Sequence, residues 1–429
     1  MKILHYCLGI PPYATGGLTI YALDLVKSQM KNNEVFMIYP GYKNKNIKLK
    51  KIKNKENINL YRIDGLLPLA LTYGVANVND FIGHKDISII KKEFDKLFLN
   101  VDILHLHTIQ GLYPEILEYF KNNNTKIILT THDFYPFSLS TKLYEDELLN
   151  IKNNIIKSLN APSKNILCLN RYPFINKLKK IKIIKKLFNK KYKIKDDDKI
   201  EEKYYKNYII ESNKLYSFYN DILNLIDLIH ANSKKSYEVY NKKCKNVKKL
   251  LITHEKIKKY NIIKNENDIL NIAYFGEEIE EKGFNLILDV LDEIYQNNKN
   301  FILKCYGYDN LYKRAYIKYM GHYKLDDLKI IYKDIDLVLF PTLNIESFGF
   351  VGLEALAYNT PLITSKNAGI KELCNKDYII NDKDELKELL IKIINDKSIL
   401  NNYFNYDLEI KDFNEHADDV INILYRGES

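Results

Sequence analysis

Two carboxylates that lie eight positions apart, Glu346 and Glu354, flank a Ser-Phe-Gly-Phe turn in the stretch 336–373 (DLVLFPTLNIESFGFVGLEALAYNTPLITSKNAGIKEL). Glu346 falls in the loop after an apolar run, and Glu354 falls inside the helix that we expect to begin near residues 348–350. The free backbone N–H groups at the start of a helix suit phosphate, and carboxylates accept hydrogen bonds from sugar hydroxyls. This spacing therefore predicts a site for an anionic, hydroxyl-rich ligand, and a sugar nucleotide has all of these parts.

Strands on either side must hold this turn in place. The apolar run at 337–340 predicts a buried strand that leads into Pro341. Upstream, the pattern predicts a strand at 270–275, a helix at 284–295 and a second strand at 301–306. Strands that alternate with helices indicate a parallel sheet, and ligands of such sheets bind beyond the carboxyl ends of the strands.

The first 135 residues show the same alternation. Helical patterns separate the strand-like runs. The predicted strands are 2–8, 35–39, 101–107 and 126–131, and the predicted helices are 17–30 and 112–121. This pattern predicts a second doubly wound sheet. Gly16, Gly17 and His132 fall at the carboxyl ends of its strands, where a ligand is expected.

Length and composition predict an α/β protein of two domains. The chain has 429 residues, of which 46% are hydrophobic, enough for two sizeable cores. We expect a Rossmann-like domain at 1–262, with a Lys- and Tyr-rich helical insertion at about 138–225, and a second Rossmann-like domain at 263–412. Residues 413–429 are expected to form a terminal amphipathic helix.

The stretch 336–373 resembles the E-x7-E signature of the retaining glycosyltransferases of family 4, which have the GT-B fold. The segments that fall in the family's order and spacing are Ser347-Phe348-Gly349, Glu354-Ala355-Leu356-Ala357, Pro361-Leu362-Ile363 and Gly369-Ile370-Lys371-Glu372-Leu373. A lone E-x7-E would occur often by chance, whereas a run of this length would not. The resemblance implies two doubly wound domains that face a cleft, with the terminal helix crossing back to the first domain. It covers the second domain well, the first at scattered loops, and 138–225 poorly.

The same resemblance implies roles for the residues of the turn. Glu354 would hydrogen-bond the ribose hydroxyls of the nucleotide, and Glu346 would lie near the donor sugar and its reacting carbon. Backbone N–H groups of the turn would meet sugar or diphosphate oxygens, and glycine at 349 lets the backbone approach closely. The turn consists of Ser347, Phe348, Gly349, Phe350 and Val351. The plain alternative is an ordinary βαβ unit with two solvated Glu residues.

The loop at 276–283 (GEEIEEKG) resembles the family's G-R-x-x-x-x-K-G loop, in which the Lys pairs with the diphosphate. Lys282 fits that Lys, and a cation there would stabilise the negative charge that develops on the departing phosphate. Glu277 stands where the family usually has Arg, and a carboxylate beside a diphosphate is repulsive. Three explanations are open. A base such as Arg314 or Lys366 offsets the negative charge of Glu277, the Glu277 side chain points away from the diphosphate, or donor binding is impaired.

Loops of the first domain also carry the resemblance. Gly16 and Gly17 follow Pro11-Pro12, as in the family's PPxxGG loop, which lies close to the donor phosphate and the acceptor. His132, in Thr-Thr-His-Asp-Phe, would contact the donor sugar. We therefore assign His132 to catalysis together with Glu346 and Lys282.

Three further histidines lie at positions that can be compared with the family pattern. His105 and His107 resemble the family's H-x-H, and their spacing puts both on one side of a strand. A metal site is a poor interpretation, because GT-B enzymes generally work without a bound metal, and we expect none. His254 stands where the family more often has an Asn-Gly turn, a second departure.

Charge and cysteine content exclude several classes. The five cysteines form no CxxC pair, so neither a zinc site nor a disulfide framework is indicated. The net charge of +10 is uneven, with a basic segment at 171–195 whose apolar residues recur at helical spacing. This segment is either an amphipathic helix that contacts an anionic membrane or an insertion helix packed on its own domain. Nucleic acid binding is not expected, because no known module accompanies the charge.

The sequence thus predicts a retaining glycosyltransferase that moves a sugar from a UDP- or GDP-linked donor to a hydroxyl of a glycan or lipid-linked acceptor, without a cofactor. Its expected setting is bacterial cell-surface polysaccharide or glycolipid synthesis. Without an apolar run of 18 residues or a signal peptide, we expect it in the cytoplasm or at the inner face of the membrane. Two alternatives stay open: a non-catalytic sugar-nucleotide-binding partner subunit, which Glu277 favours, and a sugar-nucleotide epimerase of GT-B fold.

Overall fold

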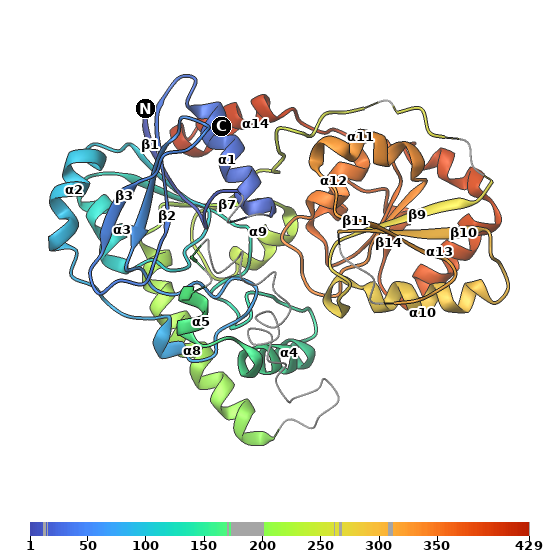
Figure 1. The fold of residues 1–429 in the computed structure, drawn as a ribbon, viewed down its shortest axis with the longest axis horizontal. Coiled ribbons are helices and arrows are strands. Elements are labelled where there is room, and N and C mark those ends of the chain that lie inside the picture. The colour runs from blue at the N-terminus through green and yellow to red at the C-terminus, as the bar shows by residue number, and fades with distance from the viewer. Residues whose placement is uncertain are drawn as a thin grey trace. The chain divides into compact units, whose positions relative to one another are not determined.

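The computed structural model describes residues 1–11, 14, 16–169, 171–172, 201–260, 262–265, 268–307 and 312–428. The chain packs into two compact units, each of which is described by itself (Figure 1). Unit 1 comprises Met1–Asn232, Tyr237–Leu250 and Ala417–Ser429, and unit 2 comprises Ser233–Ser236 and Leu251–His416. The sequence predicts a boundary between residues 262 and 263. The two units divide the chain mainly between Leu250 and Leu251, with Ser233–Ser236 also in unit 2 and Ala417–Ser429 in unit 1.

Unit 1 contains an eight-stranded sheet in the order β3-β4-β2-β1-β5-β6-β7-β8. All neighbours pair in parallel except β3 and β4, which are antiparallel. The strands are β1 (Lys2–Tyr6), β2 (Glu34–Pro40), β3 (Lys48–Lys51), β4 (Asn59–Asp64), β5 (Ile103–Leu106), β6 (Lys126–Thr130), β7 (Leu228–Ala231) and β8 (Val247–Lys249). The central strands are buried along almost their whole length, as expected for a parallel sheet that is covered on both faces.

Helices connect these strands. They are α1 (Gly17–Gln29), α2 (Ser88–Phe98), α3 (Pro114–Asn122), α4 (Glu147–Asn160), α5 (Lys164–Leu169), α8 (Glu202–Asn224) and α9 (Lys234–Tyr240), of which Lys234 to Ser236 lie in unit 2. At the carboxyl end of the chain, α14 (Phe413–Asp419) runs into a π-helical turn, Val420–Arg426. The hydroxyl of Tyr425 in this turn lies 2.7 Å from Nδ1 of His105 and accepts a hydrogen bond from Gln29, so the turn is anchored to the core of unit 1.

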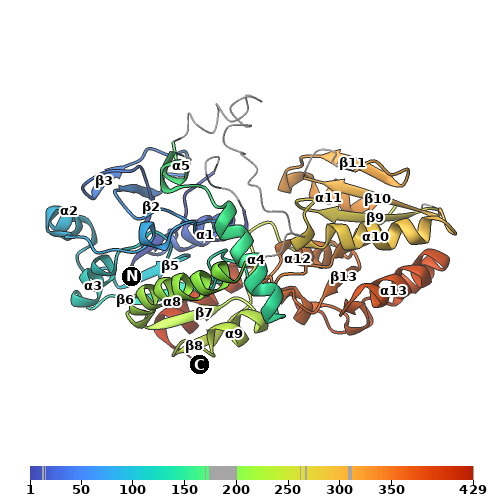
Figure 2. The ribbon, with the colours of Figure 1, turned by 90° about the horizontal axis from the view of Figure 1, so that it is seen from below.

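The described part of the predicted insertion contains the helices α4, α5 and α8. Helices α4 and α8 lie against each other (Figure 2), and α8 buries Leu215, Tyr219, Ile222 and Leu223. Of the basic segment at 171–195, only Arg171 and Tyr172 belong to the described residues, so the predicted membrane helix lies outside them. The Arg171 guanidinium donates hydrogen bonds to the carbonyl oxygens of Gly41 (3.0 Å) and Leu67 (2.7 Å). Arg171 is thus fixed to the loops that follow β2 and β4.

Unit 2 contains a six-stranded sheet in the order β11-β10-β9-β12-β13-β14, parallel throughout. The strands are β9 (Leu270–Phe275), β10 (Phe301–Tyr306), β11 (Ile317–Gly321), β12 (Leu337–Phe340), β13 (Leu362–Ser365) and β14 (Ile379–Ile380). The helices are α10 (Phe284–Tyr295), α11 (Leu328–Ile331), α12 (Phe350–Ala357) and α13 (Lys383–Asn395). These two sheets confirm the predicted pair of Rossmann-like domains.

The strand order of unit 2 reverses between β9 and β12, which makes their carboxyl ends the point where open α/β sheets bind ligands. The loops that follow these two strands carry Lys282 and Glu346, respectively. Among the described residues, no helix has both the length and the apolar character needed to cross a bilayer.

Candidate functional site

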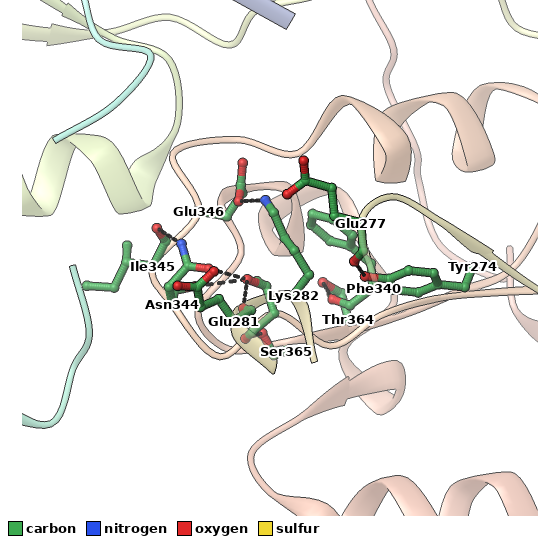
Figure 3. A network of polar contacts seen from close by, with 11 residues as sticks. Tyr274, Glu277, Glu281, Lys282, Phe340, Asn344, Ile345, Glu346, Thr364 and Ser365 are labelled. Atoms are coloured by element: carbon green, nitrogen blue, oxygen red, sulfur yellow. Dashed lines mark hydrogen bonds and ion pairs between the residues drawn. The ribbon is translucent and has the colours of Figure 1, made fainter. Parts of the chain in front are cut away.

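Lys282 and Glu346 meet at the edge where the strand order of unit 2 reverses (Figure 3). Lys282 ends a short 3-10 turn, Glu280–Lys282, between β9 and α10, and Glu346 lies in the loop between β12 and α12. The Nζ atom of Lys282 lies 2.5 Å from Oε2 of Glu346, and each side chain is about one quarter exposed (28% and 24%). This ion pair therefore remains accessible to a ligand.

Backbone contacts hold Glu346 in a strand-like conformation. Its N–H donates to the carbonyl oxygen of Asn367 (3.0 Å), and its own carbonyl oxygen accepts from the N–H of Gly369 (3.0 Å). These bonds form an isolated parallel bridge with Ala368, in the loop after β13. The loops after β12 and β13 thus support each other and fix the position of the carboxylate.

A second set of contacts joins this loop to the turn that carries Lys282. The carbonyl oxygen of Glu281 accepts hydrogen bonds from the N–H of Leu343 (3.0 Å) and the hydroxyl of Thr342 (3.2 Å), part of the network in Figure 3. Gly283 has φ = +75°, and a Cβ there would lie 2.0 Å from the carbonyl oxygen of Pro341. Glycine at 283 therefore allows the loops after β9 and β12 to approach closely enough for the ion pair to form.

The turn after Glu346 is built around Gly349, the N-cap of α12. Its φ is +112°, and a Cβ at this position would lie 2.8 Å from the ring of Phe340. The carbonyl oxygen of Ser347 accepts hydrogen bonds from the hydroxyls of Ser233 and Ser236, the latter at 3.1 Å. The turn is thus rigidly held, and the first N–H groups of α12, which lack intrahelical partners in any helix, lie directly after it.

Glu354 is buried inside α12, with an exposed fraction of 5%, and its carboxylate lies beside the imidazole ring of His254. Oε1 of Glu354 lies 3.4 Å from Nε2 of His254. The other polar atom of each side chain, Oε2 of Glu354 and Nδ1 of His254, is buried and has no hydrogen-bond partner among the described residues. A buried carboxylate needs partners, so a ligand that donates hydrogen bonds would complete this pair.

Three carboxylates give the edge near Lys282 a negative potential. The pKa of the Tyr274 hydroxyl is raised, mainly because the side chain is buried. Cys305 makes the next contribution, and the negative charges of Glu277, Glu278 and Glu346 add to it. The Tyr274 hydroxyl donates a hydrogen bond to the backbone carbonyl of Glu277 (2.6 Å). Glu277 therefore lies within electrostatic range of Tyr274, at the start of the loop that carries Lys282.

Arg314 and Lys366 are the two cations expected to offset the negative charge of Glu277, and they lie in different surroundings. Nε of Arg314 contacts both carboxylate oxygens of Asp292, at 2.8 and 2.9 Å, so its charge is already neutralised there. Lys366 directly follows β13, the neighbour of β12, and so lies at the same sheet edge as Glu346. Arg314 is therefore not available to compensate Glu277, and Lys366 stays a prediction for that role.

The predicted residues of unit 1 lie at the carboxyl edge of its own sheet. Gly16 caps α1 with φ = +110°, a conformation that favours glycine, and Gly17 is the first residue of that helix. His132 follows β6, and its ring centroid lies 5.3 Å from that of Tyr21. Burial, and then His230, lowers the pKa of His132 to about 3, so its ring is neutral at pH 7. Its neighbour Asp133 has its pKa raised by burial to about 6.

His105 and His107 lie on one side of β5, and their rings stack at 4.5 Å. His5 joins them: its Nδ1 lies 3.1 Å from Nε2 of His107, and its Nε2 lies 2.9 Å from Gln29. Ligand atoms of these three histidines all lie within 4.8 Å of one another, a spacing that could hold a metal ion. Hydrogen bonds already engage His5 at both nitrogens and His105 at both, through Tyr425 and Thr130. The cluster is accordingly explained as a polar core.

Three features of the site were not recognised in the sequence. The contact of His254 with Glu354, the support of the turn by Ser233 and Ser236, and the shifted pKa of Asp133 depend on residues far apart in the chain. His254 alone gave a signal, since it departs from the family pattern.

The second half of the chain resembles a known protein family. The family model for glycosyl transferases group 1 matches residues 253–407, a range that includes His254, Lys282, Glu346 and Glu354. An uncharacterized glycosyltransferase of Methanocaldococcus jannaschii is 24% identical over 153 residues, which cover 32% of this chain and 42% of that protein. An uncharacterized protein in the cps region of Klebsiella pneumoniae is 23% identical over 296 residues, covering 66% of this chain and 63% of that protein. The chain therefore spans less than two thirds of the length of these curated relatives.

Solved structures resemble the whole chain. The Anabaena protein HepE in complex with UDP and glucose superposes with a TM-score of 0.53 at 12% identity, covering 99% of both chains. The Escherichia coli trehalose-6-phosphate protein bound with UDP-2-fluoro glucose has a TM-score of 0.55 at 12% identity, covering 98% of this chain and 95% of that one. A lipopolysaccharide outer core galactosyltransferase, WaaB, has a TM-score of 0.54 at 11% identity and covers 98% and 99%. These likenesses establish that the chain has the GT-B fold.

Proposed function

We propose that this protein is a retaining glycosyltransferase that transfers a sugar from a nucleoside diphosphate, UDP or GDP, to an acceptor hydroxyl. The observation that carries the proposal is the convergence of Lys282, Glu346 and the rigid start of α12 on one edge of unit 2. The match of residues 253–407 to glycosyl transferases group 1 supports it, as does the UDP in the HepE complex.

In this proposal, unit 2 binds the donor. The N–H groups at the start of α12 receive diphosphate oxygens, Glu354 accepts hydrogen bonds from the ribose, and Lys282 pairs with the phosphate that will leave. Because Lys282 already contacts Glu346 at 2.5 Å, it is held at the position where charge will develop. A preorganised cation of this kind stabilises the transition state without reorganising during the reaction.

The reaction breaks the bond between the anomeric carbon and the phosphate oxygen and forms a bond from that carbon to the acceptor oxygen. Positive charge develops on the sugar ring, where the Glu346 carboxylate opposes it, while Lys282 opposes the negative charge on the departing phosphate. The acceptor proton passes to the leaving phosphate, and attack from the same face retains the configuration. His132, with its neutral ring, contributes hydrogen bonding to the donor sugar rather than charge.

We place the reaction in the synthesis of a cell-surface polysaccharide or glycolipid. Two comparisons support this setting: the Klebsiella relative lies in a cps region, and WaaB is a lipopolysaccharide galactosyltransferase. A glycan or lipid-linked acceptor follows from it. The cytoplasmic location, the membrane contact through 171–195 and the absence of a cofactor, metal or nucleic acid partner stay predictions.

A non-catalytic sugar-nucleotide-binding subunit is the second candidate, and the carboxylates around Tyr274 favour it because they weaken diphosphate binding. Incubation with a panel of UDP- and GDP-sugars distinguishes the candidates by product. Transfer, or slow hydrolysis to free nucleotide, is the expected result. Binding without turnover would indicate the partner subunit, and release of an epimerised sugar nucleotide would indicate an epimerase.

A further inference from the structure

We propose that a pocket in unit 1, enclosed by α4, α8 and the loop at 75–78, binds a neutral hexose unit of a glycan acceptor. We call it the insertion pocket, because α4 and α8 belong to the predicted insertion. The match to glycosyl transferases group 1 covers residues 253–407 and does not include it. Sugar binding is a property of unit 1 by itself, whereas the assignment of that sugar to the acceptor rests on the proposed function.

The sequence of α8 places four polar or aromatic side chains on one wall of the insertion pocket. They recur at positions i, i+3, i+4 and i+7, which share one face of a helix, and they are Tyr204, Asn207, Tyr208 and Glu211. The same face continues towards the end of the helix with side chains that are buried in unit 1, beginning at Leu215. Hydrogen-bonding groups therefore replace apolar ones where this face of α8 leaves the core and borders the pocket.

Hydrogen bonds hold the loop opposite α8 in place. Oε2 of Glu211 accepts a hydrogen bond from the N–H of Val78 (3.2 Å), which ties the loop to α8. The Ser158 hydroxyl, on α4, donates to the carbonyl oxygen of Val75 (2.6 Å). The N–H of Val75 donates to the carbonyl oxygen of Leu139 (2.8 Å). The insertion pocket is therefore preformed, and a ligand binds without the cost of ordering its walls.

The size and place of the insertion pocket suit a sugar. Its volume is about 380 Å³, at the lower end of the range of about 300–1,000 Å³ for small-molecule sites. The loop at 75–78 follows β4, and Leu139 follows β6, so both walls come from the carboxyl ends of strands. This is the edge of the sheet that carries Gly16 and His132, and Rossmann-like sheets bind their ligands there. The pocket therefore takes a small ligand on the binding side of unit 1.

The charge of the insertion pocket excludes an anionic ligand. Glu211 contributes a half-buried carboxylate, and the described residues that line the pocket include neither Lys nor Arg. A carboxylate accepts hydrogen bonds from hydroxyl groups and repels other anions. A phosphate or a uronic acid would therefore bind poorly, whereas the hydroxyl groups of a neutral sugar would be bound.

The other groups match the faces and the rim of a hexose ring. Tyr204 and Tyr208 are half-buried, so each offers an apolar ring together with a hydroxyl group. The Asn207 amide both donates and accepts hydrogen bonds, and Ile155 adds an apolar surface that is 3% exposed. A hexose carries C–H groups on its faces and hydroxyl groups around its rim. It therefore fits these walls better than an acyl chain, which would bury the Glu211 carboxylate without a partner.

NMR titration of the full chain with the methyl glycosides of glucose, galactose, mannose and glucuronic acid tests the proposal. A neutral glycoside should bind about tenfold more tightly than the glucuronide. Glu211→Gln keeps an oxygen for the N–H of Val78 but removes the charge, so it should reduce this difference to about twofold or less. Asn207→Ala should weaken binding of the neutral glycoside by about threefold to tenfold. Asn213→Ala, at an exposed position of α8 outside the pocket, is the matched control and should change neither value.

The outcomes separate this inference from the proposed function. If no neutral glycoside binds, or if the glucuronide binds equally well, the sugar site is overturned and the glycosyltransferase proposal is left intact. Binding that neither Glu211→Gln nor Asn207→Ala alters places the sugar outside the insertion pocket and also overturns the proposal. In a transfer assay, Asn207→Ala should raise the KM for the glycan acceptor but not the KM for the donor, and an unchanged acceptor KM overturns the assignment to the acceptor. If no nucleotide sugar binds, the proposed function fails, while the glycoside titration still decides the sugar site.

Discussion

The two units share a Rossmann-like architecture, but they use their polar residues in opposite ways. In unit 2, Lys282 and Glu346 form a partly exposed ion pair at the carboxyl edge of the sheet, where it can meet a ligand. In unit 1, His5 and His105 are fully buried and hydrogen-bonded inside the protein. Charge at the edge is exposed to a ligand, whereas neutral polar groups in the interior define how strands and the terminal turn pack together.

The pKa shifts express the same contrast. Burial lowers the pKa of His5 and of His230 to about 4, and it lowers the pKa of His107 well below its ordinary value. These histidines are therefore neutral at pH 7 and act as hydrogen-bonding groups without charge. In unit 2, by contrast, Glu346 pairs with Lys282 at the edge of the sheet, and Glu277 and Glu278 lie close enough to raise the pKa of Tyr274. If this comparison is correct, changes in unit 2 should affect turnover and changes in unit 1 should affect stability.

The largest effect is expected from Glu346→Gln. The change keeps the shape of the side chain but removes the charge that opposes positive charge on the sugar ring and holds Lys282. Loss of one preorganised electrostatic group typically lowers kcat by about 100- to 1000-fold. Initial rates with the preferred donor measure the effect, and Glu388→Gln, in the helix α13, is the matched control. A variant that retains more than a tenth of the wild-type kcat would show that Glu346 is not part of the catalytic machinery.

Acid should destabilise unit 1 through its histidines. Because their pKa values are lower in the folded state than the ordinary value of 6.5, the unfolded chain binds more protons at mildly acidic pH. The free energy of unfolding should therefore fall as the pH drops from about 6.5 towards 4, by about 2 kcal/mol per fully shifted histidine between pH 7 and pH 5. Asp133, with its pKa raised to about 6, acts in the opposite direction but is a single group.

Urea unfolding followed at pH 7, 6 and 5 measures this dependence. His230→Gln should make the free energy of unfolding depend less steeply on pH, because it removes one histidine whose pKa is lowered in the folded state. Stability that does not change between pH 7 and pH 5 would contradict the account of unit 1 as a neutral histidine core.

Gly349→Ala should destabilise unit 2 by about 2 kcal/mol, because the residue has φ = +112° and a Cβ would clash with Phe340 at 2.8 Å. The control is Gly83→Ala, since Gly83 also has a positive φ (+152°) but no atom within 4 Å of its Cβ position. Thermal unfolding of both variants separates the clash from the backbone strain. Equal shifts in Tm would show that the close contact with Phe340 does not matter.

Glu277→Arg restores the residue that the resembled family usually carries, and it should have the smallest effect. Replacing a carboxylate by a cation near the diphosphate should lower the Kd for UDP or GDP by about tenfold, since one repulsive contact becomes attractive. Calorimetry at low and high salt checks the electrostatic origin, because screening weakens it. An unchanged Kd would mean that Glu277 does not face the phosphates and that the second candidate function loses its main support.

Much of this organisation could be predicted from local sequence. The run at Leu270–Phe275 is buried along its entire length, so its apolar pattern alone identifies a strand of a parallel sheet. The turn around Gly349 and the burial of Glu354 follow from a dense local motif in which each residue has its expected neighbours.

Contacts between distant residues could not be predicted in this way. His254 and Glu354 are a hundred positions apart, and they meet where the segment at Tyr260 packs onto the end of α12. The hydrogen bonds from Ser233 and Ser236 to Ser347 require that four residues after β7 join unit 2, which no periodicity indicates. Tertiary structure, not residue type, decides such pairs.

Hydrogen–deuterium exchange of the full chain, with and without saturating UDP- or GDP-sugar, tests the central claim most directly. We predict slower exchange in three segments of unit 2: the loop at 276–283, the turn at 346–354 and the segment around His254. Protection should be absent from α13, which lies outside these three segments and serves as the internal reference. Protection that avoids all three segments, or no response to any nucleotide sugar, would contradict the assignment of this edge of unit 2 as the donor site.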